Sequence, residues 1–181
     1  MKPVILALPL AFLTSIAAAD CPPPPDIAAE QSALFAALQD ARNEMGARES
    51  TRALWALWTK APDATAQEML DQGMAARGAY DFLRATQQFD RLVEYCPDYA
   101  EGYNQRAFVN FLREDFEAAL IDLDLALARS PQHVGALSGK ALTLMGLGQA
   151  DAAQEVLRDA LALNPWIPER GLLREEPGED I

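Results

Sequence analysis

Small and apolar residues recur along residues 66–167 with the spacing of helices and with one longer period. Within each 34-residue stretch they lie three or four positions apart along two successive segments, the pattern of two amphipathic helices. The matched positions are Gly73, Ala107 and Ala141; Ala85, Ala119 and Ala153; Phe89, Leu123 and Leu157; and Pro97, Pro131 and Pro165. A repeat of this length predicts a stacked array of helix–turn–helix units over 66–99, 100–133 and 134–167.

Each class of matched residue has a structural role in such a unit. The small residue of the first helix lets the two helices approach closely, and the alanine of the second helix stands where they cross. The proline ends the second helix because the residue before a proline is disfavoured in the α region. A single helix pair buries only one side, so the units must stack. The predicted fold is all-α, a right-handed α-solenoid of stacked antiparallel helix pairs.

Residues 27–65 show a weaker version of the same pattern. Apolar positions predict a helix from 27 to about 45, which Gly46 ends, and a second helix from about 49 to 59. Counting back from Pro62 as the repeat proline makes this helix pair a degenerate first repeat. Its second helix carries two tryptophans, 55 and 58. Packing of one of them over a neighbouring helix is the first interpretation, and stacking on an aromatic ligand is the alternative.

The N-terminal residues 1–19 have the features of a secretory signal peptide. Lys2 precedes a nearly continuous apolar stretch, and three alanines, 17–19, supply the small residues of a cleavage site. The apolar stretch is roughly 13 residues long, too short for a membrane-spanning helix, so no membrane insertion is expected after cleavage behind Ala19. The excess of arginine over lysine suggests a GC-rich bacterial genome. The predicted location is periplasmic or secreted.

The charge balance limits the classes of partner. The chain carries 15 basic and 27 acidic side chains, a net charge of −12. Phosphate backbones would be repelled, so we expect no nucleic-acid partner, and anionic lipid surfaces are disfavoured for the same reason. Neutral or basic partners remain.

Two cysteines lie outside the predicted signal peptide. Residues 20–26 form a proline-rich, extended spacer that contains Cys21, and Cys96 ends a predicted helix. In an oxidising compartment a disulfide between them would tie the spacer to the array. Alternatively, Cys96 is a small buried apolar residue and Cys21 is incidental or bonds another thiol.

The residue pattern of the units resembles the tetratricopeptide repeat. The stretch 100–107, Ala-Glu-Gly-Tyr-Asn-Gln-Arg-Ala, and the stretch 115–120, Asp-Phe-Glu-Ala-Ala-Leu, carry the resemblance most clearly. Position 7 of the repeat departs from the usual leucine, and long polar side chains there are expected to lay their stems on the core. The order of elements is similar to that of small exported bacterial tetratricopeptide proteins with a tryptophan-containing N-terminal helix pair. No catalytic activity follows from that similarity.

The resemblance implies a concave groove lined by the first helix of each unit, where a peptide lies. The residues at its groove positions are Leu70, Met74, Arg77, Asn104, Phe108, Phe111, Ser138, Leu142 and Met145. This face is mostly apolar; Asn104 would hold a peptide backbone and Arg77 would meet a carboxylate. The basic residues of a C-terminal carboxylate clamp are missing, so such a clamp is not expected. Alternatively, the two phenylalanines pack within the protein itself.

Signs of catalysis or metal binding are scarce. His133 stands at a unit junction without ligands at metal spacing, so inter-repeat hydrogen bonding is expected of it. No cofactor and no metal are predicted. The C-terminal tail, 168–181, is expected to begin with a short helical turn over the last unit, with Trp166, and to end in an acidic run.

These patterns predict a non-catalytic periplasmic protein–protein interaction module that binds a protein or peptide of the cell envelope in its groove. The alternative is a self-associating structural element, a homo-oligomer stacked end to end. An enzyme is the third choice.

Overall fold

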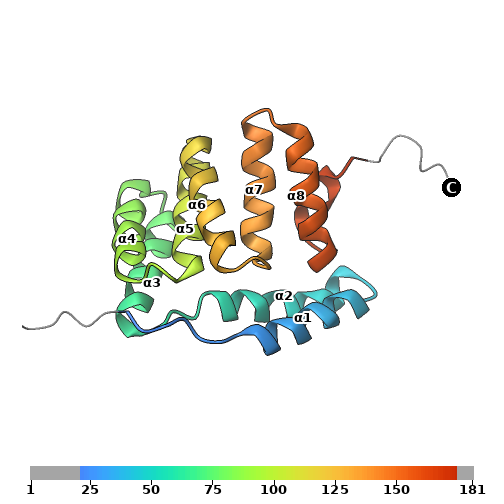
Figure 1. Cartoon of the computed structure of the whole chain (residues 1–181), viewed down its shortest axis with the longest axis horizontal. Helices are drawn as coiled ribbons and strands as arrows, with labels where there is room; N and C mark the ends of the chain where they lie inside the picture. Colours follow the sequence, from blue (N-terminus) through green and yellow to red (C-terminus); the bar gives the residue numbers. More distant parts are fainter. Residues whose placement is uncertain (1–20, 175–181) are drawn as a thin grey trace, which may run out of the picture.

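The computed structural model describes residues 21–174, so the predicted signal peptide and the tail from residue 175 lie outside the described residues. Within them the chain forms eight α-helices and a short 3-10 helix, and no strand (Figure 1). The elements are α1 (Ala28–Asp40), α2 (Glu44–Trp58), α3 (Ala64–Gly78), α4 (Phe82–Tyr95), α5 (Ala100–Leu112), α6 (Phe116–Arg129), α7 (Val134–Gly146), α8 (Ala150–Leu163) and η1 (Pro168–Leu172). None of the described helices is long and apolar enough to span a membrane.

Helices α3 to α8 form three antiparallel pairs that stack side by side, as the period predicted (Figure 1). In each pair the turn between the helices contains one residue with positive φ, namely Tyr80, Glu114 and Gly148. These positions are 34 residues apart, so the turn geometry repeats even where the residue is not glycine. Asp81 and Asp115 then cap the second helix by accepting hydrogen bonds from backbone amides three residues on.

Among the matched small residues only Gly73 is a glycine, and it faces Phe89, the only phenylalanine among Phe89, Leu123 and Leu157. A Cβ atom at Gly73 would lie 2.4 Å from a ring carbon of Phe89, which is fully buried. The other two units pair an alanine with a leucine at these positions. In the first unit, the missing side chain of Gly73 on one helix therefore makes room for the larger ring of Phe89 on the other helix.

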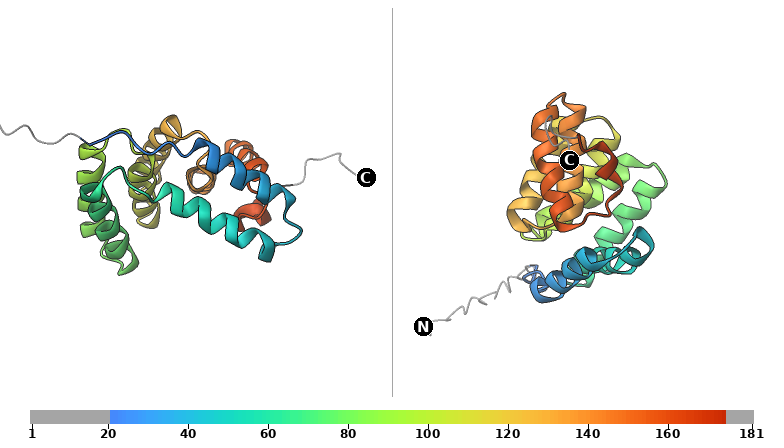
Figure 2. Two further views of the ribbon diagram at one scale, coloured as in Figure 1. Left: turned by 90° about the horizontal axis from the view of Figure 1, so that it is seen from below. Right: turned by 90° about the vertical axis from the view of Figure 1, so that its right-hand side faces the viewer.

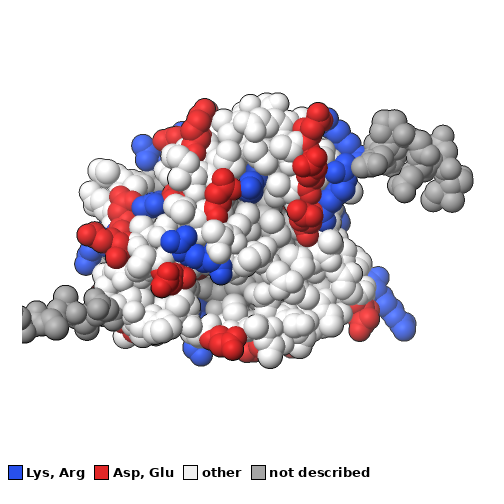
Figure 3. All heavy atoms as spheres, in the orientation of Figure 1, with Lys and Arg blue, Asp and Glu red and all other residues white. Residues whose placement is uncertain are grey.

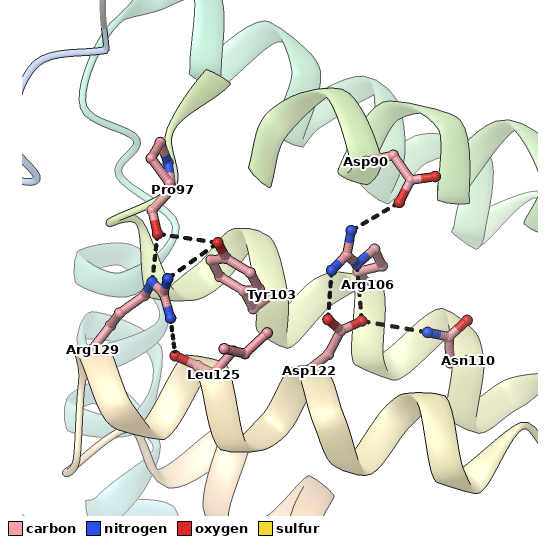
Figure 4. Close-up of polar contacts among 8 residues, drawn as sticks. All are labelled: Asp90, Pro97, Tyr103, Arg106, Asn110, Asp122, Leu125 and Arg129. Atoms are coloured by element: carbon pink, nitrogen blue, oxygen red, sulfur yellow. Dashed lines mark hydrogen bonds and ion pairs between the residues drawn. The ribbon is translucent and has the colours of Figure 1, made fainter. Parts of the chain in front are cut away.

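At repeat position 7, ion pairs take the place of the usual leucine in the second unit (Figure 4) and in the third, whereas Gln72 of the first unit donates to Glu68 of its own helix. Arg106 binds both carboxylate oxygens of Asp122, at 2.9 and 2.6 Å, and its third contact is Asp90, at 2.9 Å. The hydrogen bonds to Asp122 raise the pKa of Arg106. In the next unit Lys140 pairs with Asp124 at 2.6 Å. The sequence interpretation expected the charged ends of these side chains to be exposed. Instead, the charged groups of Arg106 and Lys140 join successive helices of the stack.

The N-terminal helices differ from the prediction in their bounds. The first helix ends at Asp40, not near Met45, which is exposed, and the second begins at Glu44. Gly46 lies in the first turn of α2, where its amide donates to the Asn43 side chain at 2.9 Å. The asparagine is therefore the helix start signal that the glycine-based interpretation overlooked.

The same helices do not extend the array as a further layer. They lie crosswise along one side of it (Figures 1 and 2), packed mainly on the third unit. Buried Phe35, Leu38, Leu54 and Trp58 share one apolar cluster with side chains of α7 and α8 and with Ile167. The description of residues 27–65 as a degenerate first repeat therefore does not match their position.

The segment after α8 closes this cluster. Trp166 donates from its indole nitrogen to the Leu38 carbonyl oxygen at 2.9 Å, so it bonds the N-terminal pair and not only the last unit. The 3-10 helix η1 matches the expected short turn, and Gln154 exchanges hydrogen bonds with the backbone of Leu172 and Arg174. The predicted acidic run falls outside the described residues.

At the opposite end of the N-terminal pair, a disulfide joins Cys21 to Cys96, with their Cα atoms 5.1 Å apart. Cys96 is buried in the core of the first unit, among Ala61, Phe89 and Tyr99. The proline-rich spacer is thus held against the first unit, while helix α1 rests on the third.

Candidate functional site

A cavity of about 670 Å³ lies between helix α2 and the inner row of helices α3, α5 and α7. Helix α2 contributes Leu54, Trp55 and Trp58, and residues 164–169 form a further wall. Most of the lining atoms are carbon. The groove that the resemblance implied is therefore covered on one side by the protein's own N-terminal helix pair, and what remains of it is a partly open pocket.

Seven of the nine predicted groove residues line this cavity: Met74, Arg77, Asn104, Phe108, Phe111, Ser138 and Leu142. Leu70 does not, because it is fully buried in the core of the first unit beside Ala61 and Tyr99. Met145 is also absent from the lining, since it packs on the apolar cluster that the N-terminal pair forms with the third unit. The assignment of Leu70 to the groove is wrong, and Met145 is covered by the N-terminal pair.

The two tryptophans of α2 have different environments. Trp58 is buried in the core and stacks on the His133 ring, with centroids 4.2 Å apart. Trp55 keeps 39% of its surface exposed and lines the cavity. A Cβ atom at Gly135 would lie 2.5 Å from the Trp55 ring, so only glycine admits the ring at this point of α7. The groove prediction had no α2 residue; Gly135 and the paired tryptophans were the available signal.

A buried hydrogen-bond network lies beside the cavity and joins the three units. The carboxylate of Glu101, which is 1% exposed, accepts from Asn104 at 2.9 Å, from Gln105 at 2.5 Å and from His133 at 2.8 Å. Gln105 in turn accepts from Arg77 at 2.6 Å. Helices α3 and α5 and the start of α7 are thereby fixed relative to one another.

The protonation of His133 follows from its contacts. Its Nδ1 atom accepts the backbone N–H of Ala136 at 3.2 Å, so the proton sits on Nε2, which donates to Glu101. The imidazole is therefore both the cap of α7 and the link to the preceding unit. The expected inter-repeat hydrogen bonding of this histidine is confirmed. No metal-binding cluster of histidine, cysteine and carboxylate side chains occurs within residues 21–174.

Arg77 is the cation that lines the cavity. Its guanidinium carbon lies 4.5 Å from the centroid of the Phe108 ring. Burial lowers the pKa of Arg77, and the negative charge of Glu101 acts in the opposite direction. Because Gln105 connects the two charged groups, the positive charge at the cavity already has a nearby negative partner.

Two uncharged polar groups line the cavity at the same position of successive units, Asn104 on α5 and Ser138 on α7. Both are more than nine-tenths buried. The hydroxyl oxygen of Ser138 has no hydrogen-bond partner in the part of the chain that the structure describes, and the side-chain oxygen of Asn104 takes part in none of the bonds identified there. An unsatisfied buried hydroxyl is unfavourable by about 1–3 kcal/mol until a partner reaches it.

The surface outside the cavity has no single dominant charge on the face shown in Figure 3. Acidic and basic side chains alternate over the array, with acidic ones aligned over α8. The surface is mostly uncharged where α7 and α8 meet the N-terminal pair. This distribution gives no basic tract on that face for a nucleic acid.

Comparisons with known proteins agree with this architecture, although no family model matches the chain. A TPR repeat-containing protein of Rhizobium etli is 35% identical over 88 residues, which cover 49% of this chain and 36% of that protein. The tetratricopeptide repeat protein 36 homolog of Nematostella vectensis is 37% identical over 76 residues, covering 42% and 41%. The chain therefore spans well under half the length of these two relatives.

Among solved structures, the first TPR domain of Spaghetti (RPAP3), bound to the HSP90 peptide SRMEEVD, matches with a TM-score of 0.58 at 19% identity. The match covers 60% of this chain and 86% of that domain. The fold is accordingly a tetratricopeptide-like solenoid of helix pairs. Both relatives are named for this repeat type, and the three units have the helix-pair fold of tetratricopeptide repeats.

Proposed function

We propose that this protein is a non-catalytic interaction module of the bacterial periplasm that binds a segment of a partner protein of the cell envelope. The observation that carries the proposal is the cavity between α2 and the inner helices. It is apolar, it is lined by equivalent positions of all three repeats, and it contains the unpartnered hydroxyl of Ser138 beside the Asn104 side chain. Such cavities are where proteins hold ligands.

Solved tetratricopeptide domains support a peptide or protein as the partner. The RPAP3 domain holds the HSP90 peptide SRMEEVD, and a second RPAP3 domain holds the HSP70 peptide SGPTIEEVD. Repeat arrays present extended inner surfaces to such partners. For the present chain the partner segment would contact Phe108 and Leu142, two of the half-buried or exposed apolar residues of the cavity wall.

The disulfide supports the proposed location. Disulfides persist in oxidising compartments and are rare in the cytosol. The Cys21–Cys96 bond, together with the signal-peptide pattern of residues 1–19, favours export. The acidic composition is compatible with a neutral or basic partner.

Site-specific photo-crosslinking in cells tests the proposal. A crosslinking amino acid replaces Leu142, in the cavity, or Ile121, which is 62% exposed on α6 and outside the cavity. We expect a protein product from position 142 and not from 121, and the same product from purified components. The change Phe108→Ala should weaken it. Equal products from both positions, or no product from 142, would refute the assignment of the cavity as the binding site.

A further inference from the structure

The roof of the cavity is anchored to the rest of the fold. Leu54 and Trp58 of α2 are buried in the apolar cluster that the pair shares with the third unit. The Tyr99 hydroxyl donates to the Trp58 carbonyl oxygen at 2.7 Å, which fixes the end of α2 to the first unit. These contacts hold α2 over the inner helices and oppose its movement away from them. A ligand must therefore fit under α2.

The size of the cavity limits the part of the ligand that it can hold. About 670 Å³ falls in the range of roughly 300–1,000 Å³ that is usual for ligand pockets. Trp55, Phe108 and Phe111 supply aromatic wall area, which suits an aromatic or branched aliphatic group. One large side chain with its neighbouring peptide groups fits these limits.

The charge of the site favours a neutral ligand. Arg77 already has Glu101 as its nearby negative partner, through Gln105. An anion entering the cavity would lose its hydration. Among the described residues, the only cation that lines the cavity is Arg77, and the buried carboxylate of Glu101 lies near it. A carboxylate therefore gains little here, in contrast to the acidic peptide that RPAP3 holds.

The unused polar groups favour an amide. Ser138 and Asn104 stand on neighbouring helices at one repeat position, and neither oxygen has an identified partner among residues 21–174. A serine hydroxyl rotates between three staggered positions, so it can turn toward a group that enters. A peptide group offers both a donor and an acceptor to such a pair.

We infer that the cavity selects a neutral segment of the partner, with one aromatic or branched aliphatic side chain inserted under α2. Ser138 and Asn104 bind the flanking peptide groups. The segment lies within the partner's chain and not at its carboxyl end. This inference rests on the proposed function, since it names the chemistry of the partner at the same cavity.

NMR titration of the ¹⁵N-labelled protein (residues 20–181) tests this chemistry with four probes. These are N-acetyl-phenylalanine amide, N-acetyl-phenylalanine with its free carboxylate, toluene, and the acidic peptide SRMEEVD. We expect the amide to shift the backbone signals of residues 138, 139 and 142. The carboxylate and SRMEEVD should bind at least about tenfold more weakly, because an anion is desolvated without compensation.

A pair of variants isolates the hydroxyl. Ser138→Ala removes the unpartnered oxygen at the cavity, and Thr86→Val removes the other unpartnered buried hydroxyl, on α4 outside the lining. Ser138→Ala should lower the affinity for the amide about 5- to 30-fold and leave that for toluene within about twofold. Thr86→Val should change neither.

Each contrary result has a defined meaning. Tighter binding of the carboxylate or of SRMEEVD overturns the neutral specificity. Toluene binding as tightly as the amide, with no effect of Ser138→Ala, assigns the cavity to free apolar molecules and overturns the peptide-group contacts. If no probe shifts residues 138–142, the inference fails. Crosslinking from position 142 would then still decide the proposed function separately.

Discussion

Replacing Gly73 by alanine tests whether the two helices of the first unit pack closely because Gly73 leaves room for the Phe89 ring. In a helix interior, alanine is favoured over glycine by about 1 kcal/mol. At this position, however, the new Cβ atom would lie 2.4 to 2.8 Å from three carbons of the buried Phe89 ring. Overpacking of this kind is unfavourable by about 1–3 kcal/mol. We therefore expect Gly73→Ala to lower the free energy of unfolding by up to about 2 kcal/mol.

The second unit supplies the compensating change. It pairs Ala107 with Leu123, and a Phe89→Leu substitution in the first unit would reproduce that combination. Phe89→Leu alone leaves a gap and should destabilise the protein by about 1–2 kcal/mol. In the double variant the new methyl group fills part of that gap. The two substitutions should therefore show a favourable coupling of about 1–3 kcal/mol.

Chemical denaturation of the wild type, the two single variants and the double variant measures this coupling. Gly78→Ala is the matched control, since the same helix offers nothing within 4 Å of a Cβ atom there. It should be neutral or slightly stabilising. Additive effects of the two substitutions, or a Gly73→Ala variant as stable as Gly78→Ala, would refute the packing argument.

Two further predictions concern the disulfide and the cap of α3. The Cys21→Ser, Cys96→Ser variant opens a loop of 75 residues, so the unfolded chain gains entropy. The free energy of unfolding should fall by about 4 kcal/mol relative to the wild type. Equal stability of the two proteins would contradict a stabilising role of the disulfide. Asp63 accepts hydrogen bonds from the Ala66 amide at 2.8 Å and from the Tyr95 hydroxyl at 2.8 Å, and the first of these is the main cause of its lowered pKa. A lowered pKa in the folded state stabilises the protein above the unfolded pKa, about 4, and this contribution is lost as the pH falls through the folded value. Asp63→Ala should therefore be less stable than the wild type at pH 7, with the difference shrinking on acidification below pH 4; a difference that stays constant from pH 7 to pH 2 would argue against the carboxylate as the cause.

The periodic part of the molecule was readable from the sequence because its determinants are local or repeat exactly once per unit. The spacing of apolar residues sets the helices, and the prolines and the positive-φ turn positions set where they end. Equivalent residues of successive units then occupy equivalent places. The family resemblance then supplied the groove positions, and seven of the nine residues assigned to them line the cavity.

The N-terminal pair was misplaced because its neighbours are distant in the sequence. Nothing near Leu38 or Trp58 indicates that they pack on α7, α8 and Ile167, about a hundred residues further along the chain. Apolar residues at helical spacing specify a buried face, not the surface that buries it. The cover that the N-terminal pair places over Met145 was missed for the same reason.

The sequence by itself determined the period of the repeats and the positions of the three regular helix pairs along the chain. Only the tertiary structure decided that α2 covers the inner face, that Glu101 and His133 form a buried pair at the junction with the third unit, and that Ser138 lies unpartnered at a cavity. The physical reason is that repeat geometry follows from short-range periodicity, whereas the cavity exists where two non-repeating surfaces meet. Their contact depends on the shapes of both surfaces, and no local pattern records it.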